Sequence, residues 1–135
     1  MEIKFIIITP HSYCKNDENP VRHCDRRALK EALELRDVIE SRGHTVDFFQ
    51  ADRFRSEIDY NRFSARTYDI RIKFRELVKK YHQQGYYIIV FEMHSFPGKL
   101  YYHFDNANIG LFSIPRYEKD MYFLSNYLKE KTKLS

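Results

Sequence analysis

Two stretches of this chain share one pattern. Residues 6–12 and 88–95 each contain a run of apolar, mostly β-branched side chains that ends in a histidine followed by a serine. An apolar run of this length is typical of a strand buried on both faces of a sheet. In an open α/β sheet, ligands bind beyond the carboxyl ends of the strands. We therefore expect His11 and His94 to meet around one ligand, and the expected ligand is a metal ion.

Predicted strands and helices alternate along the chain. The expected strands cover residues 2–9, 44–49, 86–93 and 109–114, and the expected helices cover residues 25–42, 67–84 and 116–131. Apolar side chains that recur every three or four residues indicate the helices, and Gly43 and Gly85 are typical helix stops. Residues 50–66 are polar and arginine-rich, and we expect a long functional loop there. Residues 96–106 are expected to form a loop or hairpin.

This order predicts an α/β fold with three layers, in which helices flank a mainly parallel or mixed sheet. Residues 86–93 are expected to form the central strand. Right-handed crossovers would place His11 and His94 at the same edge of the sheet. A chain of 135 residues fits a single domain over residues 1–135.

Composition narrows the class of protein. The formal net charge is only +4, and no arginine-rich block supports a nucleic-acid groove. No run of about 18 apolar residues is present, so we expect no membrane span. The chain starts directly with a strand-like segment and has no charged leader, which favours a cytoplasmic protein. Two cysteines, Cys14 and Cys24, could form a disulfide, but we expect reduced thiols in such a protein.

A catalytic zinc site needs three protein ligands, so the two histidines need a partner. Zinc takes His, Asp, Glu or Cys and leaves one position for water. Asp25 follows the loop that comes after His11, and Cys14 stands three residues after His11. Each has a plain alternative role. Asp25 is a good helix cap, and Cys14 is a good small buried residue.

A second group of polar residues lies in the segment 55–62. An arginine fork matches a carboxylate in two-point contact, and Asn61 beside Arg62 adds an amide donor. Arg55 would reach the same pocket across a turn, with Asp59 holding one arginine in place. The alternative is a solvated loop with salt bridges.

Four motifs in order resemble the N-formylglutamate amidohydrolase family, which is related to zinc carboxypeptidases and aspartoacylase-like deacylases. They are residues 10–12, Asp25, the set of Arg55, Asp59, Asn61 and Arg62, and residues 92–97. The similarity covers approximately residues 3 to 114 and implies a phosphorylase/hydrolase-like fold with one zinc ion. By this resemblance, the metal ligands are His11, Asp25 and His94, the substrate carboxylate is held by Asn61 and Arg62, and Arg55 lies near the scissile carbonyl.

The chain also departs from the family pattern. Cys14 stands where the carboxypeptidase-like pattern has a glutamate, so Asp25 is the favoured acidic ligand and Cys14 is kept in reserve. Members of the family carry a general-base glutamate on a late strand, and we find no counterpart of that strand in this sequence. Glu92 is the nearest substitute, on the same strand face as His94, and it also suits the orientation of a metal ligand. Glu118 is a more remote substitute.

The function expected from these residues is zinc-dependent hydrolysis of an amide bond. The substrate would be an N-acyl amino acid or a peptide-like molecule with a carboxylate, and an open pocket would suit a larger one. A homodimer is another way to complete the pocket, and the tyrosines from Tyr101 to Tyr127 suit such an interface. A degenerate relative that only binds metal or carboxylate is the main alternative. A small nucleic-acid-binding protein is the third.

Overall fold

The computed structural model describes residues 2–14 and 24–94, together with the helical residues 119, 122, 123, 126 and 130. The chain divides into two compact units, Met1–Ser95 and Phe96–Ser135. Everything described below belongs to the first unit. Its elements are β1 (Ile3–Thr9), α1 (Arg26–Ser41), β2 (Val46–Gln50), the short 3-10 helix η1 (Phe63–Thr67), α2 (Asp69–Gln83) and β3 (Tyr87–Glu92).

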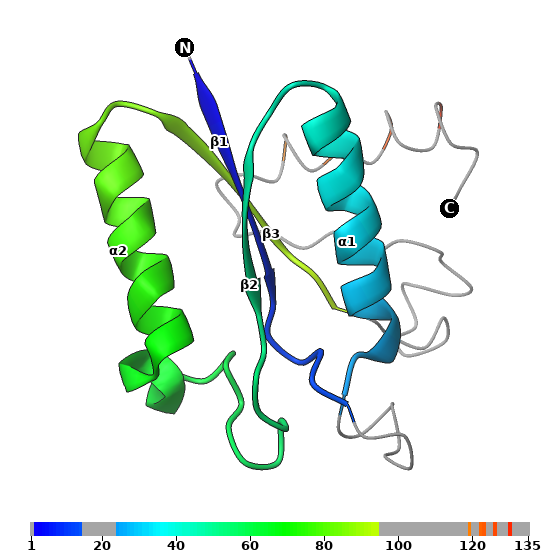
Figure 1. The fold of residues 1–135 in the computed structure, drawn as a ribbon, viewed down its shortest axis with the longest axis vertical. Coiled ribbons are helices and arrows are strands. Elements are labelled where there is room, and N and C mark those ends of the chain that lie inside the picture. The colour runs from blue at the N-terminus through cyan, green and yellow to red at the C-terminus, as the bar shows by residue number, and fades with distance from the viewer. Residues whose placement is uncertain are drawn as a thin grey trace. The chain divides into compact units, whose positions relative to one another are not determined.

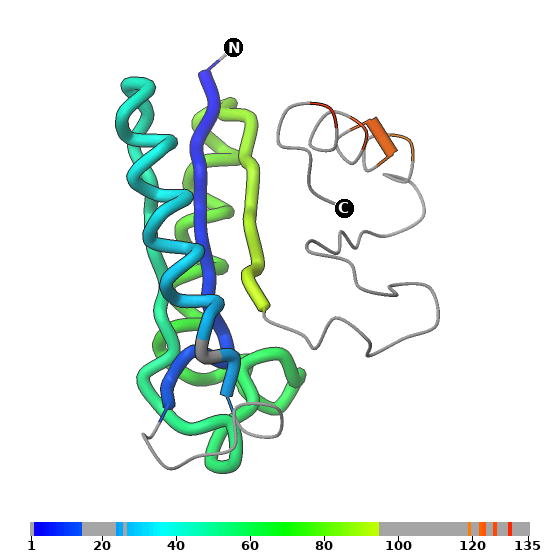
Figure 2. The backbone as a smooth tube through the Cα atoms, turned by 90° about the vertical axis from the view of Figure 1, so that its right-hand side faces the viewer, coloured from blue at the N-terminus to red at the C-terminus, as the bar shows by residue number. Residues whose placement is uncertain are grey.

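The three strands form a parallel sheet in the order β2-β1-β3. In the register, Ile7 of β1 stands between Phe48 of β2 and Phe91 of β3. The parallel direction follows from the helical connections, because a strand that is followed by a helix returns to the sheet in the same direction. Figure 2 shows β1 and β3 running side by side. Their carboxyl ends therefore lie at one edge of the sheet.

The two helices contact different side chains of β2. Ala32 and Ile39 of α1 pack on Ile7, with Phe48 of β2 partly buried against them. Phe74 of α2 contacts Phe49, the next residue along β2, with the ring centroids 5.9 Å apart. Consecutive strand residues point to opposite faces, which agrees with the placement of α1 and α2 to either side of the strands in Figure 1.

Most predicted elements within the described residues are confirmed. The first three strands and first two helices are present, with ends that differ by up to two residues from the predicted ends. Gly43 and Gly85 end the helical segments with φ of +85° and +82°. Glycine adopts this left-handed region without the steric cost that a side chain would add.

Three details refine the predictions. Among the three described strands β1 is the central one, and residues 86–93 lie beside it. The run in β3 is also less buried than the run in β1, since Ile6, Ile7 and Ile8 are fully buried whereas Val90 is 41% exposed. The expected loop 50–66 contains the start of η1. An apolar run reveals a strand, but its place in the sheet depends on distant parts of the chain.

Some predictions fall outside the described residues. These are the strand at 109–114, the loop or hairpin at 96–106, and the interface tyrosines from 101 to 127 other than Tyr122. Glu118 also lies outside them. Among the residues that the structure describes, no helix is both long enough and apolar enough to cross a membrane.

Candidate metal centre

Three side chains from three parts of the chain meet at the carboxyl edge of the sheet. His11 follows β1, Asp25 precedes α1, and His94 follows β3. The three side chains each offer one ligand atom, and these atoms lie within 4.8 Å of one another. The predicted meeting of the two histidines is thus confirmed for the described residues, and Asp25 stands between them.

Asp25 is the shared partner of both imidazole rings. Its Oδ2 lies 2.9 Å from Nδ1 of His94 and 3.6 Å from Nδ1 of His11. The two rings meet edge to face, with centroids 5.1 Å apart. His11 is 5% exposed, whereas the His94 side chain is 35% exposed. The cluster is therefore buried on the side of His11 and open to solvent on the side of His94.

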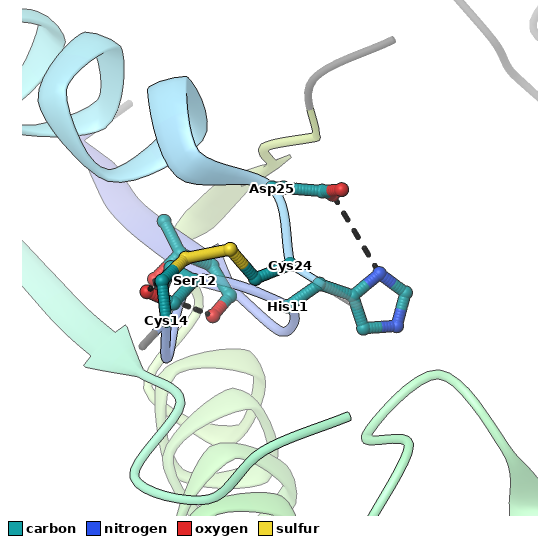
Figure 3. The surroundings of a disulfide bond; sticks show 6 residues. His11, Ser12, Cys14, Cys24 and Asp25 are labelled. Atoms are coloured by element: carbon teal, nitrogen blue, oxygen red, sulfur yellow. Dashed lines mark hydrogen bonds and ion pairs between the residues drawn. A yellow bond between two sulfur atoms is a disulfide. The ribbon is translucent and has the colours of Figure 1, made fainter. Parts of the chain in front are cut away.

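The alternative role of Asp25 as a helix cap is not observed. Asp25 is the N-cap residue of α1, but its side chain makes no capping hydrogen bond. Its backbone N–H instead donates to the carbonyl of His11, at 2.8 Å. This bond ties the start of α1 to the end of β1 and leaves the carboxylate directed at the two rings. Figure 3 shows it facing the ring of His11.

Two further carboxylates hold the outer nitrogens of the rings. Nε2 of His11 lies 2.6 Å from Oδ1 of Asp59, and Nε2 of His94 lies 3.3 Å from Oε1 of Glu92. A carboxylate can only accept, so each Nε2–H donates. The Nδ1 atoms of both rings face Oδ2 of Asp25, which accepts from the Nδ1–H of a protonated His94 at 2.9 Å. Carboxylates placed in this way orient the imidazole ligands of metal sites.

The charges of this cluster shift several pKa values. The hydrogen bonds that His94 makes to the carboxylates of Asp25 and Glu92 raise its pKa to about 9. Burial acts to raise the pKa of Asp25, but the hydrogen bonds of His11 and His94 outweigh it and lower the value to about 2. The hydrogen bond of His94 lowers the pKa of Glu92. Without a metal, the cluster is an ion pair of a protonated His94 with two carboxylates.

The arginine-rich segment is anchored beside these rings by a small core of its own. Tyr60 is 2% exposed and packs with Ala51 and Ala65. Its hydroxyl donates to Asp52, and its carbonyl accepts from Nε of Arg71 at 2.6 Å. Burial, followed by the bond to Asp52, raises the pKa of Tyr60. This core holds Asp59 and Asn61 in place on either side of the tyrosine.

Arg55 and Arg62 converge on Asp59. The Nε atom of Arg55 lies 3.4 Å from Oδ2 of Asp59, and the Nε atom of Arg62 lies 3.6 Å from it. The other oxygen, Oδ1, accepts the hydrogen bond from Nε2 of His11. The prediction that Asp59 holds an arginine in place is therefore confirmed for both. The Arg62 side chain is 75% exposed and the Arg55 side chain 36% exposed. Two guanidinium groups and an imidazole share one carboxylate, so this corner attracts a further anion.

Sequence reasoning missed Arg71, which comes from α2. Its Nη2 donates to Oδ1 of Asn61 at 3.2 Å and lies 3.9 Å from Oε1 of Glu92. The amide nitrogen of Asn61 lies 3.3 Å from Nε2 of His94. The Asn61 side chain is thus directed at His94 of the candidate metal centre and at Arg71. Arg71 stands on the partly buried face of α2, and a cation on such a face is the signal that was overlooked.

The expectation of reduced thiols is wrong, because Cys14 and Cys24 form a disulfide. Their Cα atoms are 5.5 Å apart, within the range that a disulfide spans. The backbone bond between His11 and Asp25 brings these two stretches together, a contact that no sequence pattern indicates. As half of a disulfide, Cys14 is not available as a metal ligand.

Comparison of this chain with protein-family models, with curated proteins and with solved structures gave no match. Membership of the amidohydrolase family therefore stays a prediction carried by the motif residues.

Proposed function

We propose that this protein is a zinc-dependent hydrolase of amide bonds in N-acyl amino acids or peptide-like substrates that carry a carboxylate. One observation carries the proposal: two imidazoles direct their Nδ1 atoms at one carboxylate, while separate carboxylates hold their outer nitrogens. The residues that would hold zinc are His11, Asp25 and His94. The resemblance of the motifs to the N-formylglutamate amidohydrolases supports the same ligand set.

The donor set and its spacing fit zinc. Two nitrogens and one oxygen make a common ligand set for catalytic zinc, and at usual bond lengths two ligand atoms of a tetrahedral zinc are about 3.3 Å apart. The observed separations from Oδ2 of Asp25, 2.9 Å and 3.6 Å, lie on either side of this value. Small side-chain adjustments would therefore suffice for binding.

Electrostatics give a reason for a cation at this point. The Asp25 carboxylate faces Nδ1 of both rings, and Asp59 and Glu92 place two further carboxylates at their outer nitrogens, so a positive charge among these atoms is favoured. In the metal-free protein a proton on His94 supplies this charge, which explains its raised pKa. A zinc ion would replace that proton, since metal ligands must be deprotonated.

Zinc, when bound, lowers the pKa of a coordinated water and polarises a carbonyl. The arginines beside it would position the substrate. Arg62, the more exposed, suits the substrate carboxylate, because its single contact with Asp59 at 3.6 Å is easily exchanged for a two-point contact. Arg55 is closer to Asp59 and suits the carbonyl oxygen that gains charge during the reaction.

Glu92 fits a positioning role better than the role of general base. Its carboxylate accepts from His94 and lies near Arg71, and its lowered pKa makes it a weaker base. This observation favours the second candidate function, a metal- and carboxylate-binding protein without turnover. The metal site and the arginine pair are common to both candidates, and only an activity measurement separates them.

The proposal extends to the architecture of the whole chain. We propose a three-layer, hydrolase-like fold in which the described parallel sheet and its two helices form one part, with a cytoplasmic location and a single domain. The parallel order of β2, β1 and β3 supports the fold proposal, because ligand sites of such sheets lie at their carboxyl edge. A homodimer would be a way to enclose the open side of the centre at His94.

The test is a hydrolysis screen of zinc-loaded protein against N-formyl and N-acetyl amino acids and short peptides, with amine release as the readout. Arg62→Gln should raise KM by about tenfold or more through loss of a charged contact. The matched control is Arg66→Gln, whose guanidinium contacts the carbonyl and ring of Phe63 in the described part of the chain. Bound zinc without turnover would favour the second function, and equal KM values for both variants would remove Arg62 from the substrate site.

A further inference from the structure

The disulfide joins the two segments that carry two of the three candidate ligands. Cys14 lies three residues after His11, and Cys24 directly precedes Asp25. Cys24 is 1% exposed. Figure 3 shows the sulfur bridge beside the pair of His11 and Asp25. The bridge therefore joins the segment that leaves β1 to the segment that enters α1.

Few other bonds fix this junction. Between the two segments, the Asp25 N–H donates to the His11 carbonyl at 2.8 Å, and the Asp25 carboxylate lies 3.6 Å from the His11 ring. Within the first segment, the Ser12 hydroxyl bonds to Thr9. The Asp25 carboxylate makes no capping bond and instead lies 2.9 Å from the His94 ring. Among the described residues, the disulfide is the one covalent cross-link between the two segments. The disulfide, between cysteines ten residues apart in the sequence, thus restrains the two candidate ligands His11 and Asp25.

We propose that the Cys14–Cys24 disulfide is a redox-controlled staple of the metal centre, so that its reduction weakens the binding of a divalent metal ion. This inference rests on the proposed metal site. In the step, a dithiol reductant gives two electrons and two protons to the disulfide; the S–S bond of the protein breaks, two thiols form, and the reductant becomes a disulfide.

The physical basis is the freedom of the chain. A disulfide removes conformations that the open chain would otherwise sample, and this restraint favours the arrangement in which His11 and Asp25 face each other. After reduction, noncovalent contacts such as the backbone bond from Asp25 to His11 hold the two segments together, and metal binding must supply the restraint that the disulfide gave. We expect zinc affinity to fall on the order of tenfold or more. His94 comes from β3, so its position does not depend on the bridge.

The experiment has one readout with metal and one without it. Zinc affinity of the full chain is measured by competition with a chromophoric chelator, before reduction, after reduction and removal of the reductant, and after reoxidation. Exchange of the Asp25 amide hydrogen is measured on metal-free protein in the same states. We expect reduction to weaken zinc binding and to speed exchange at Asp25, and reoxidation to reverse both.

The double variant Cys14→Ser/Cys24→Ser is the matched control, because it should behave like the reduced protein and ignore redox treatment. Exchange at Ile7, in the centre of the sheet, reports whether the variant keeps its fold. Equal exchange and equal affinity in both redox states would overturn the proposal, as would tighter zinc binding after reduction, which would make Cys14 a ligand. Faster Asp25 exchange without zinc binding in either state would remove the metal site and the proposed function but keep the staple.

Discussion

The two ends of the sheet each carry a polar cluster, and the clusters are built differently. At the amino end, the Tyr81 hydroxyl donates to Asp47 at 2.6 Å, and Nζ of Lys4 lies 4.5 Å from the centre of the Tyr86 ring. At the carboxyl end, two imidazoles share Asp25. At the amino end, each polar group already has its own partner. At the carboxyl end, two imidazole rings converge on the Asp25 carboxylate, and this arrangement leaves a place for a cation. The difference distinguishes a structural cluster from a candidate site.

Removal of His11 should have the largest effect at the carboxyl end. In His11→Ala, zinc binding should be lost, and Asp25 and Asp59 lose a buried partner. Leaving a buried carboxylate without its hydrogen-bond donor costs about 1–3 kcal/mol, so the free energy of unfolding should fall by about this amount. Urea unfolding and zinc titration measure the two effects. Unchanged zinc affinity in a folded variant would mean that the ring has a structural role only.

Removal of the carboxylates behind the rings should have the next largest effect. Asp59→Asn and Glu92→Gln should each weaken zinc binding about 10–100-fold, because the imidazoles lose the group that orients them. Asp59→Asn should have the greater effect, since its bond to His11 is 2.6 Å long against 3.3 Å for Glu92 and His94. Asp37→Asn, on the exposed side of α1, is the matched control and should change nothing.

The pH dependence of stability should also distinguish the two ends. In the metal-free protein, the folded pKa of His94 is about 9, above its ordinary value of 6.5. Its stabilising contribution is therefore complete below pH 6.5 and is lost as the pH rises through 9. Because its side chain is 35% exposed, we expect only about 1 kcal/mol. His94→Gln should abolish this loss, and an identical pH profile in that variant would contradict the assignment.

The smallest effect is expected at the amino end. Tyr81→Phe removes the hydrogen bond to Asp47 and should lower the free energy of unfolding by about 1 kcal/mol. Zinc affinity should stay at the wild-type value, because Tyr81 lies near the start of the parallel strands and the metal centre lies beyond their ends. A drop in zinc affinity similar to that of His94→Ala would show that the two clusters are not independent.

Local patterns were sufficient to predict the strands, the helices and the meeting of the two histidines. The apolar run before His11 predicts β1, the glycines predict the helix ends, and parallel strands bring His11 and His94 to one edge. These features depend on hydrophobic periodicity and on the handedness of crossovers, which a single sequence reveals.

Features that depend on long-range contacts could not be predicted in this way. The exposure of Val90 in β3 and the disulfide between Cys14 and Cys24 both depend on how distant segments pack, which periodicity does not reveal. Arg71 of α2 contacts Asn61, which precedes η1, and its helical spacing alone does not reveal this contact. Asp59 was expected to bind an arginine, but its bond to His11 required the fold of the segment around Tyr60.

The most direct test of the metal centre is X-ray absorption spectroscopy at the zinc edge of the loaded, disulfide-intact protein. We predict one zinc per chain with only nitrogen and oxygen neighbours at about 2.0–2.1 Å, including two imidazoles, and loss of one imidazole signal in His94→Ala. Absence of retained zinc, sulfur neighbours at about 2.3 Å, or a spectrum that His94→Ala leaves unchanged would contradict it.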